Sequence, residues 1–221
     1  LADGFFRIGN DRYAKENGTF GLTTLKKSHV KVTGELIVFN YIGKRSIRHR
    51  QTVVSRDLAR FVNVLLKVPG VRLFRYQDVD GVWHNIESAQ VNQYLQDLAD
   101  FPYSAKDFRT WGGTLRAATV LADVGPAESV REAKRNVATA IRLVAAELGN
   151  TPTICRKAYV HPVVIERYLD EGDTIQLPSS AGGDAAGPRA SGVHSVEEHA
   201  LIKFLDSHFP ERRKRRRTGS D

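Results

Sequence analysis

Apolar residues at helical spacing, interrupted by proline and glycine, constrain the fold of this 221-residue chain more than any other feature. Apolar positions three or four residues apart bury one face of a helix, and Pro or Gly marks where helices begin or end. The pattern predicts helices that begin after Ser55, at Ser88, at Ser104, at Pro152 and at Pro162. A longer helix ends at Gly149, and its apolar stripe is Val130, Ala133, Val137, Ile141, Val144 and Leu148.

A β region precedes these helices. Residues 21–54 are predicted to form antiparallel strands, because 36–41 is rich in β-forming residues and 46–54 can return against it. A tight Gly43-Lys44 turn would place Lys44 at a hairpin tip, where its side chain can move into a groove. Residues 83–86 are expected to form a short bridge before the helix at Ser88. The predicted fold class is α+β, mainly α-helical with a small antiparallel β region near the N-terminus.

Composition limits the partners of the chain. Its net charge is +8, which suits nucleic acid or an anionic membrane, but six of the basic residues form one run near the C-terminus. No apolar run approaches the roughly 20 residues that span a bilayer, so no membrane association is expected. The single cysteine, Cys155, excludes an internal disulfide and fits a reducing cytosol. Cys155 is either a nucleophile or a small buried residue on a helix, and the second reading is favoured.

The C-terminal part differs in composition from the rest. Residues 173–195 are rich in Gly, Ala, Ser and Pro and are interpreted as a flexible linker. Residues 196–210 are interpreted as an amphipathic helix, and 211–221 as a basic tail. The tail is either solvated or in contact with phosphates, through Arg212, Arg213, Lys214, Arg215, Arg216 and Arg217.

Residues 149–162, GNTPTICRKAYVHP, carry the most specific motif. They closely resemble the stretch around the active-site tyrosine of type IB DNA topoisomerases, particularly the bacterial and poxvirus-like branch. In that family a tyrosine hydroxyl attacks a DNA phosphodiester and becomes joined to the 3′ phosphate. The resemblance implies that Tyr159 is this nucleophile, on the helix that begins at Pro152.

Such a reaction needs particular side chains. Planar arginine forks stabilise the negative charge of the transition state, and a general acid protonates the leaving 5′ oxygen. The segment FFRIGNDRY at 5–13 resembles the family's first arginine segment, IGKR at 42–45 its lysine hairpin, and KDFRTWG at 106–112 its second arginine segment. These matches imply Arg7 and Arg109 as the arginines and Lys44 as the acid.

The resemblance covers residues 1 to about 172, the expected catalytic domain, and one position departs from part of the family. Asn150 stands where poxvirus members carry His, so it can donate a hydrogen bond to a phosphate oxygen but cannot transfer a proton. Tyr13 and Lys106 are expected to contact DNA. Each residue alone is more often a surface charge, a packing aromatic or a helix end. The order of all five catalytic candidates in matching segments is what favours catalysis.

The expected function is relaxation of supercoiled DNA by transient cleavage of one strand and religation. The expected partner is double-stranded DNA, bound by a monomer in the cytoplasm, at the nucleoid if the source is bacterial. No cofactor and no metal are expected, because the sequence shows no cluster of acidic residues, His or Cys at metal-ligand spacing. The chain starts at Leu1, almost at the Arg7 segment, so it is expected to be a fragment without the small N-terminal domain of this family.

Two alternatives remain open. A tyrosine recombinase shares the Arg-Lys-Arg-Tyr chemistry, but recombinases typically carry His three residues before the second arginine, where this chain has Lys106. A DNA-binding module could keep the fold without catalysis, against which the complete set of candidate residues argues.

Overall fold

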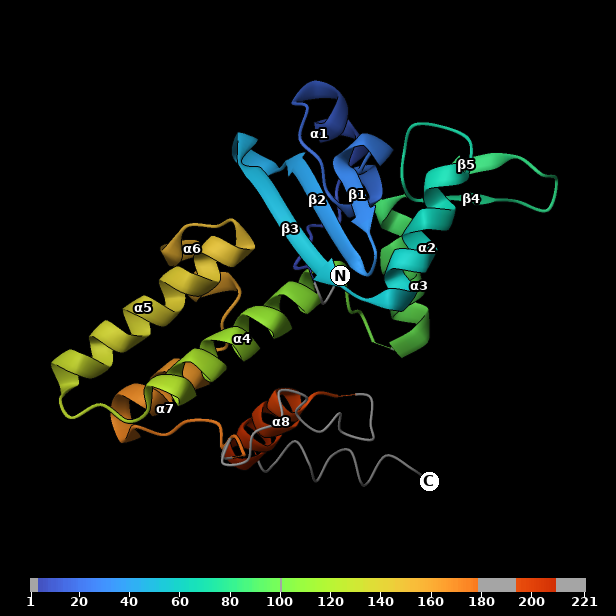
Figure 1. Cartoon of the computed structure of the whole chain (residues 1–221). Helices are drawn as coiled ribbons and strands as arrows, with labels where there is room; N and C mark the ends of the chain where they lie inside the picture. Colours follow the sequence, from blue (N-terminus) through green and yellow to red (C-terminus); the bar gives the residue numbers. More distant parts are fainter. Residues whose placement is uncertain (1–3, 100, 179–193, 210–221) are drawn as a thin grey trace, which may run out of the picture. The chain divides into compact units, whose positions relative to one another are not determined.

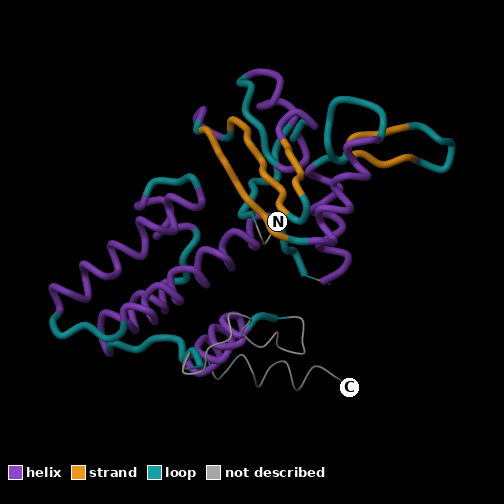
Figure 2. The backbone as a smooth tube through the Cα atoms, in the orientation of Figure 1, coloured by secondary structure: helices purple, strands orange, loops and turns teal. Residues whose placement is uncertain are grey.

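The computed structural model describes residues 4–99, 101–178 and 194–209. The chain divides into two compact units, Leu1–Arg109 and Thr110–Asp221 (Figure 1). Helices predominate, and every strand in the described part of the chain lies in the first unit (Figure 2). The predicted α+β class is therefore confirmed. The predicted division into a catalytic domain (1–172), a linker (173–195), a helix (196–210) and a tail (211–221) stays a prediction.

The first unit is built on a three-stranded antiparallel sheet in the order β1-β2-β3. Its strands are β1 (Val30–Thr33), β2 (Leu36–Ile42) and β3 (Arg48–Val54), in the predicted region. In β2 the buried residues alternate along the strand, which places Ile37, Phe39 and Tyr41 on the core face. Strands β4 (Arg75–Gln77) and β5 (Trp83–Asn85) form a separate hairpin, where the sequence indicated only a short bridge at 83–86.

Helix α2 (Arg56–Lys67) covers the core face of this sheet (Figure 1). Its predicted N-cap is confirmed, because the Ser55 hydroxyl accepts a hydrogen bond from Leu58 N at 3.3 Å. Helix α3 (Ser88–Ala99) follows the β4–β5 hairpin, and the short α1 (Asp11–Glu16), which was not predicted, precedes the sheet. The buried core comprises Phe6, Leu25, Ile37, Phe39, Tyr41, Val53, Ala59, Val62, Leu65 and Leu73.

The turn between β2 and β3 differs from the prediction. In place of a tight Gly43-Lys44 turn there is a 3₁₀ turn at Lys44–Ser46, in which Arg45 and Ser46 adopt left-handed φ angles of 64° and 57°. Gly43 has an ordinary φ of −99°, so the turn does not need its freedom. It is required for space, because a Cβ there would lie 2.5 Å from Cδ2 of His49. Lys44 nevertheless lies at the tip of the hairpin.

The second unit is helical. Helix α4 (Ala105–Val124) begins in the first unit and continues into the second from Thr110. The other elements of the second unit are α5 (Val130–Leu148), α6 (Pro152–Ala158), α7 (Pro162–Glu171) and α8 (Val196–His208). Gly149 ends α5 in the left-handed conformation (φ 61°), as its sequence position predicts. Helix α5 packs on both α6 and α7. Cys155 is fully buried on α6, which confirms the favoured reading of this cysteine.

No helix in the described part of the chain is long and apolar enough to cross a membrane.

Candidate active site

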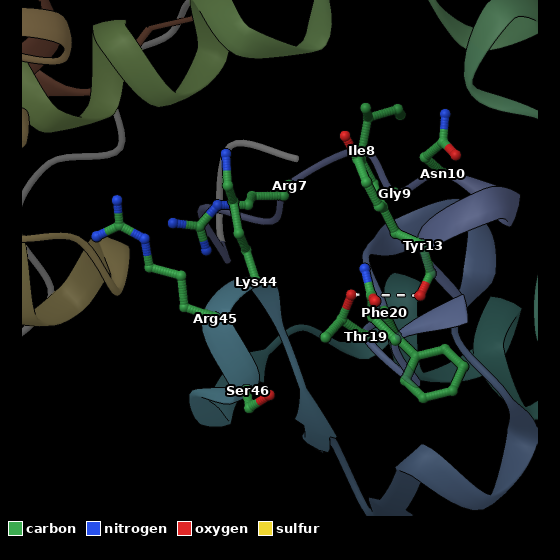
Figure 3. Close-up of a pocket in the computed structure, with 11 residues that line it drawn as sticks. Arg7, Ile8, Gly9, Asn10, Tyr13, Thr19, Phe20, Lys44, Arg45 and Ser46 are labelled. Carbon is green, nitrogen blue, oxygen red and sulfur yellow. Dashed lines mark hydrogen bonds between the residues drawn. The ribbon is translucent and has the colours of Figure 1, made fainter. Parts of the chain in front are cut away.

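Two of the predicted catalytic residues line one pocket of the first unit. Arg7, from the segment before α1, and Lys44, from the β2–β3 turn, border a cavity of about 560 Å³ (Figure 3). Arg45 lines it from the same turn, Asn10 lines it as the N-cap of α1, and Tyr13 lines it from α1 itself. The cavity therefore combines three basic side chains with polar groups, a composition suited to an anionic ligand.

The backbone around Arg7 is fixed by the loop before β1. The carbonyl of Arg7 accepts a hydrogen bond from Leu22 N at 2.8 Å, and that of Ile8 accepts one from Thr23 N at 2.8 Å. Gly21 permits this contact, because a Cβ there would lie 2.6 Å from the Arg7 carbonyl oxygen and 2.5 Å from Gly9 N. Arg7 thus projects from a main chain that has little freedom to move.

A buried aromatic stack lies beside the two arginines. The Tyr41 ring stacks on Phe6 (centroids 5.9 Å apart) and on His49 (5.2 Å), and its hydroxyl donates to Oε1 of Gln51 at 2.7 Å. Burial raises the pKa of Tyr41 to about 12, although the positive charges of Arg7 and Arg109 act to lower it. Burial, followed by the same two arginines, lowers the pKa of His49. Both candidate arginines therefore lie within electrostatic range of one stack.

Arg109 is tied to the segment that carries Arg7. It lies on α4 with only 3% of its surface exposed, and its Nη1 donates to the carbonyl oxygen of Phe5. Phe5 has a left-handed φ of 49°, which is unfavourable for a bulky residue and persists only where the surroundings impose it. The Arg109 bond is one such constraint, so the structure links Arg7 and Arg109 through Phe5.

The histidine of the stack makes stability depend on pH. His49 is 8% exposed, and its Nε2 has no hydrogen-bond partner among the described residues. Because its pKa is lower in the folded state than the unfolded value of about 6.5, acidification below that value protonates the unfolded state preferentially. Stability is therefore fully present above about pH 6.5 and falls as the pH approaches the folded-state pKa.

We expect the free energy of unfolding, measured with urea at pH 7.5 and 5.5, to fall less in His49→Phe than in the unsubstituted chain. The phenyl ring keeps the stack on Tyr41 and cannot titrate. A smaller dependence will remain, because burial, and then the charge of Lys26, also lowers the pKa of His29. An equal loss in both proteins would contradict the assignment to His49.

Tyr159 lies in the second unit, and its position corrects one prediction. It is not inside a helix but follows α6 as its C-terminal cap, with φ −135° and ψ −4°. The helix cannot continue through Pro162, because proline has no N–H to donate to the Ala158 carbonyl and disfavours helical geometry in His161. The nucleophile candidate is thus on a short connection between two helices.

Helix α4 holds this connection closely. At Gly113, a Cβ would lie 2.6 Å from the Tyr159 carbonyl oxygen and 3.4 Å from the Tyr159 Cβ. Next to it, the buried Thr114 hydroxyl donates to the Thr110 carbonyl at 2.7 Å and accepts from His161 N at 3.0 Å. These two residues fix the main chain on both sides of the Tyr159 side chain. The prediction missed them, although the Gly112-Gly113 pair inside a helix was a usable signal of close packing.

We expect Thr114→Val to destabilise the chain by about 1–3 kcal/mol, because the partly buried His161 N–H loses the Thr114 hydroxyl as an acceptor. It should also slow covalent transfer at saturating DNA, since the Tyr159 connection loses an anchor. Thr119→Val is the matched control, because Thr119 makes the same kind of bond to its own helix (to the Leu115 carbonyl, 2.9 Å) and lies further along α4 than Thr114. Equal effects of the two substitutions would rule out this role for Thr114.

Three further predicted site residues lie on or beside helices. Asn150 lies between α5 and α6, where its backbone N–H donates to the Ala145 carbonyl at 2.9 Å, so it and Tyr159 flank the same short helix. Tyr13 is exposed on α1, and Lys106 is exposed in the first turn of α4. The six basic residues at 212–217 lie outside the described residues.

The described part of the chain contains no group of three His, Cys, Asp or Glu that could hold a metal ion.

Comparison with known proteins identifies the family. A family model described as the catalytic core of eukaryotic DNA topoisomerase I matches residues 2–178. The chain belongs to this family. The match covers nearly all of the first unit, the second unit as far as residue 178 and all five candidate catalytic residues, and it confirms the type IB resemblance.

Three viral members of the family show the extent of the similarity. The chain is 28% identical over 169 residues to DNA topoisomerase 1B of Acanthamoeba polyphaga mimivirus, a match that covers 73% of the chain and 50% of the relative. It is 28% identical over 172 residues to DNA topoisomerase 1 of rabbit fibroma virus (77% and 52%). It is 27% identical over 171 residues to DNA topoisomerase 1B of vaccinia virus strain Copenhagen (76% and 51%).

The chain spans about half the length of the curated relatives it matches. The expectation of a specifically bacterial relationship is not borne out, because these relatives come from a mimivirus and from poxviruses.

Proposed function

We propose that this chain is the catalytic part of a type IB DNA topoisomerase that relaxes supercoiled duplex DNA. Tyr159 attacks a backbone phosphorus, the Oη–P bond forms as the P–O5′ bond breaks, and a 3′-phosphotyrosyl intermediate results. The duplex rotates about the intact strand, and the free 5′ hydroxyl then reverses the reaction. Because the bond energy is retained in the phosphotyrosine, religation needs no ATP.

The other candidate residues stabilise the transition state and supply the proton for the leaving group. Arg7 and Arg109 bind the non-bridging oxygens, where their guanidinium forks offset the charge that develops in the transition state. Asn150 donates one further hydrogen bond. Lys44 supplies a proton to the leaving 5′ oxygen, and the phenol proton of Tyr159 passes to water. These basic side chains provide the charge stabilisation that a divalent metal would otherwise give.

The observation that carries the proposal is the arrangement of cationic groups around the Arg7 segment. Arg7 and Lys44 line one cavity, and the Arg109 guanidinium bonds to the carbonyl two residues before Arg7. Three basic residues that lie far apart in sequence thus converge on one segment of the first unit. A phosphodiester is the ligand that such a set fits, because phosphate accepts bidentate arginine and point-charge lysine contacts.

Further DNA contacts belong to the proposal. Tyr13 and Lys106 contact the duplex near the cavity, and the tail of residues 211–221 adds phosphate contacts that do not depend on sequence. The enzyme acts on DNA as a monomer. The recombinase alternative is not favoured, since the matching family and the relatives above are topoisomerases.

Supercoiled plasmid incubated with the chain in EDTA and without ATP tests the proposal. We expect a ladder of topoisomers that moves toward the relaxed form, together with covalent transfer to a duplex whose cleaved fragment is short enough to dissociate. A recombinase would instead join strands from two different duplexes. A DNA-binding module would shift the plasmid on a gel without changing its topology, and either result would overturn the proposal.

A further inference from the structure

The first unit contains a second basic pocket, on another face of α1. This cavity of about 430 Å³ is bordered by four cationic side chains, Lys15, Lys26, Arg72 and Arg75, and none of its described lining residues is acidic. Lys15 comes from α1, Lys26 from the loop before β1, Arg72 from the segment before β4, and Arg75 from β4 itself. The fold has therefore gathered charges that the sequence keeps apart, although like charges repel when they are brought together.

Helix α1 forms a wall of both pockets. Asn10, Tyr13 and Asn17 border the cavity that contains Arg7 and Lys44, whereas Ala14 and Lys15 border the second one. Tyr13 and Lys15 are two residues apart on the helix and therefore point to different faces of it. Phe20 also borders both pockets, so the two cavities are neighbours in the first unit.

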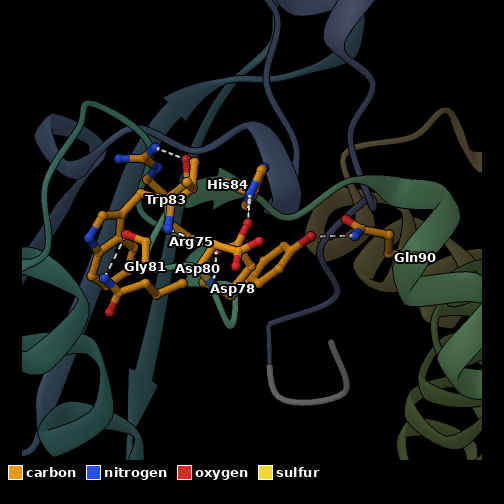
Figure 4. A network of polar contacts seen from close by, with 10 residues as sticks. Arg75, Asp78, Asp80, Gly81, Trp83, His84 and Gln90 are labelled. Carbon is orange, nitrogen blue, oxygen red and sulfur yellow. Dashed lines mark hydrogen bonds and ion pairs between the residues drawn. The ribbon is translucent and has the colours of Figure 1, made fainter.

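Both arginines of the second pocket are held by hydrogen bonds or ion pairs, and each still has a side-chain nitrogen without an acceptor among the described residues. Arg72 Nη2 pairs with Oδ2 of Asp11 at 2.8 Å, and Arg72 Nη1 is buried without a partner among the described residues. Arg75 Nη1 donates to the Pro69 carbonyl and its Nη2 to the Trp83 carbonyl at 2.8 Å (Figure 4). Arg75 Nε is also buried and has no partner in the described part of the chain.

Unsatisfied buried donors on oriented guanidinium groups indicate an anionic ligand. Buried donors without acceptors are rare in folded proteins, and a guanidinium offers five N–H groups to oxygen atoms. The carboxylate of Asp11 pairs with this set through Arg72, and that hydrogen bond lowers the pKa of Asp11, so Asp11 offsets one positive charge. Three positive charges remain from the four residues.

We propose that this second pocket binds a backbone phosphate of the DNA other than the one that Tyr159 attacks. The identity of the ligand as DNA rests on the proposed function, whereas the preference for phosphate oxygens rests on the pocket. A duplex carries one phosphate charge per roughly 1.7 Å of its axis, counted over both strands, so other phosphates lie close to the one that is attacked. One duplex can therefore offer a phosphate to each of two neighbouring pockets, and the exposed Lys15 and Lys26 border the second one.

Occupancy of the pocket also positions α1. Arg72 holds Asp11, in the first turn of α1, through one nitrogen and would hold the phosphate through another. The same helix presents Tyr13 to the first cavity. A phosphate in the second pocket would thus fix the wall of the first one.

Salt dependence of DNA binding tests the proposal with the whole chain. The variant Lys15→Gln/Lys26→Gln removes two charges from the entrance, and Lys31→Gln/Lys67→Gln removes two exposed charges that line neither pocket. We expect the slope of log affinity against log salt concentration to fall by about 0.9 for each phosphate interaction that the first variant removes. The control slope should change little. Equal changes in the two variants would overturn the proposal in favour of a diffuse charge effect.

Nuclear magnetic resonance of the arginine Nε–H groups gives a second, local measurement. We expect a cognate duplex, and more weakly inorganic pyrophosphate, to shift the Arg75 Nε–H signal. The signal of Arg56, whose Nε is paired with Glu35 at 2.8 Å, should stay in place. A shift with pyrophosphate alone would overturn DNA as the ligand, and no shift with either would overturn the site.

Covalent transfer to DNA, recorded on the same samples, separates the two proposals. At saturating protein the unsubstituted chain and the control Lys31→Gln/Lys67→Gln should cleave DNA at the same rate, because neither control lysine lines either cavity. If the unsubstituted chain transfers normally but Lys15→Gln/Lys26→Gln does not change the salt slope, only the proposal for the second pocket is contradicted. If that variant changes the slope but the unsubstituted chain shows no covalent transfer, only the topoisomerase proposal is contradicted.

Discussion

Tyr159→Phe is expected to abolish the covalent protein–DNA adduct and to leave non-covalent DNA binding nearly unchanged. The phenol oxygen is the proposed nucleophile, and without it no Oη–P bond can form. The loss of one hydroxyl removes at most one hydrogen bond, worth about 0.5–1.5 kcal/mol, so binding should weaken no more than about tenfold. Denaturing gels that retain labelled DNA on the protein measure the adduct, and a gel-shift titration measures binding.

Tyr94→Phe is the matched control for this experiment. Tyr94 is 65% exposed on α3 and lines neither pocket of the first unit, so its variant should form the adduct at the normal rate. An adduct formed by Tyr159→Phe would mean that another residue attacks the phosphate. Cys155 would be a poor replacement because it is fully buried within α6.

Helix boundaries were predictable because local chemistry sets them. Ser55 caps α2 with its hydroxyl, and Gly149 ends α5 in a left-handed conformation that glycine adopts without strain. Pro162 begins α7 because its fixed φ suits the first turn of a helix. In each case the residue acts on its own neighbours in sequence, so no tertiary information was needed.

Features that depend on distant segments were not predictable in this way. Gly43 and Gly113 are both needed for close approach, to the His49 ring and to the Tyr159 main chain, and a single sequence does not show which partner approaches. The expected tight turn at Gly43 was wrong for this reason. The short α1 was also missed, because six residues with no buried member show no apolar stripe.

For the candidate site, too, the residue types were predictable from the sequence, whereas the contacts between distant segments were not. Its residue types came from matching segments of a known family, and the family match supports that reading. The link from Arg109 to Phe5, the stack of Tyr41 and His49 beside the arginines and the hold of Thr114 on His161 came only from the structure. Sequence motifs name the groups that react, whereas the contacts that orient them are set by packing between elements.

Lys44→Ala is expected to slow DNA cleavage by about 10²–10⁴-fold, the usual cost of losing a general acid. Lys44 lies at the tip of the β2–β3 hairpin and borders the cavity with Arg7, a position from which an exposed side chain can reach a bound strand. Single-turnover cleavage at saturating protein measures the effect without a contribution from binding.

A substrate with sulfur in place of the bridging 5′ oxygen identifies the origin of that loss. A thiol has a pKa of about 8.5, far below the value of about 15.7 for water, so a thiolate leaves without taking a proton. The sulfur substrate should therefore restore most of the rate to Lys44→Ala.

Lys44→Arg extends the comparison, because arginine keeps the positive charge but does not release a proton near neutral pH. It should be slow on the normal substrate and fast on the sulfur substrate. If Lys44→Arg cleaves normal DNA at the original rate, or if sulfur rescues neither variant, Lys44 stabilises charge and is not the acid.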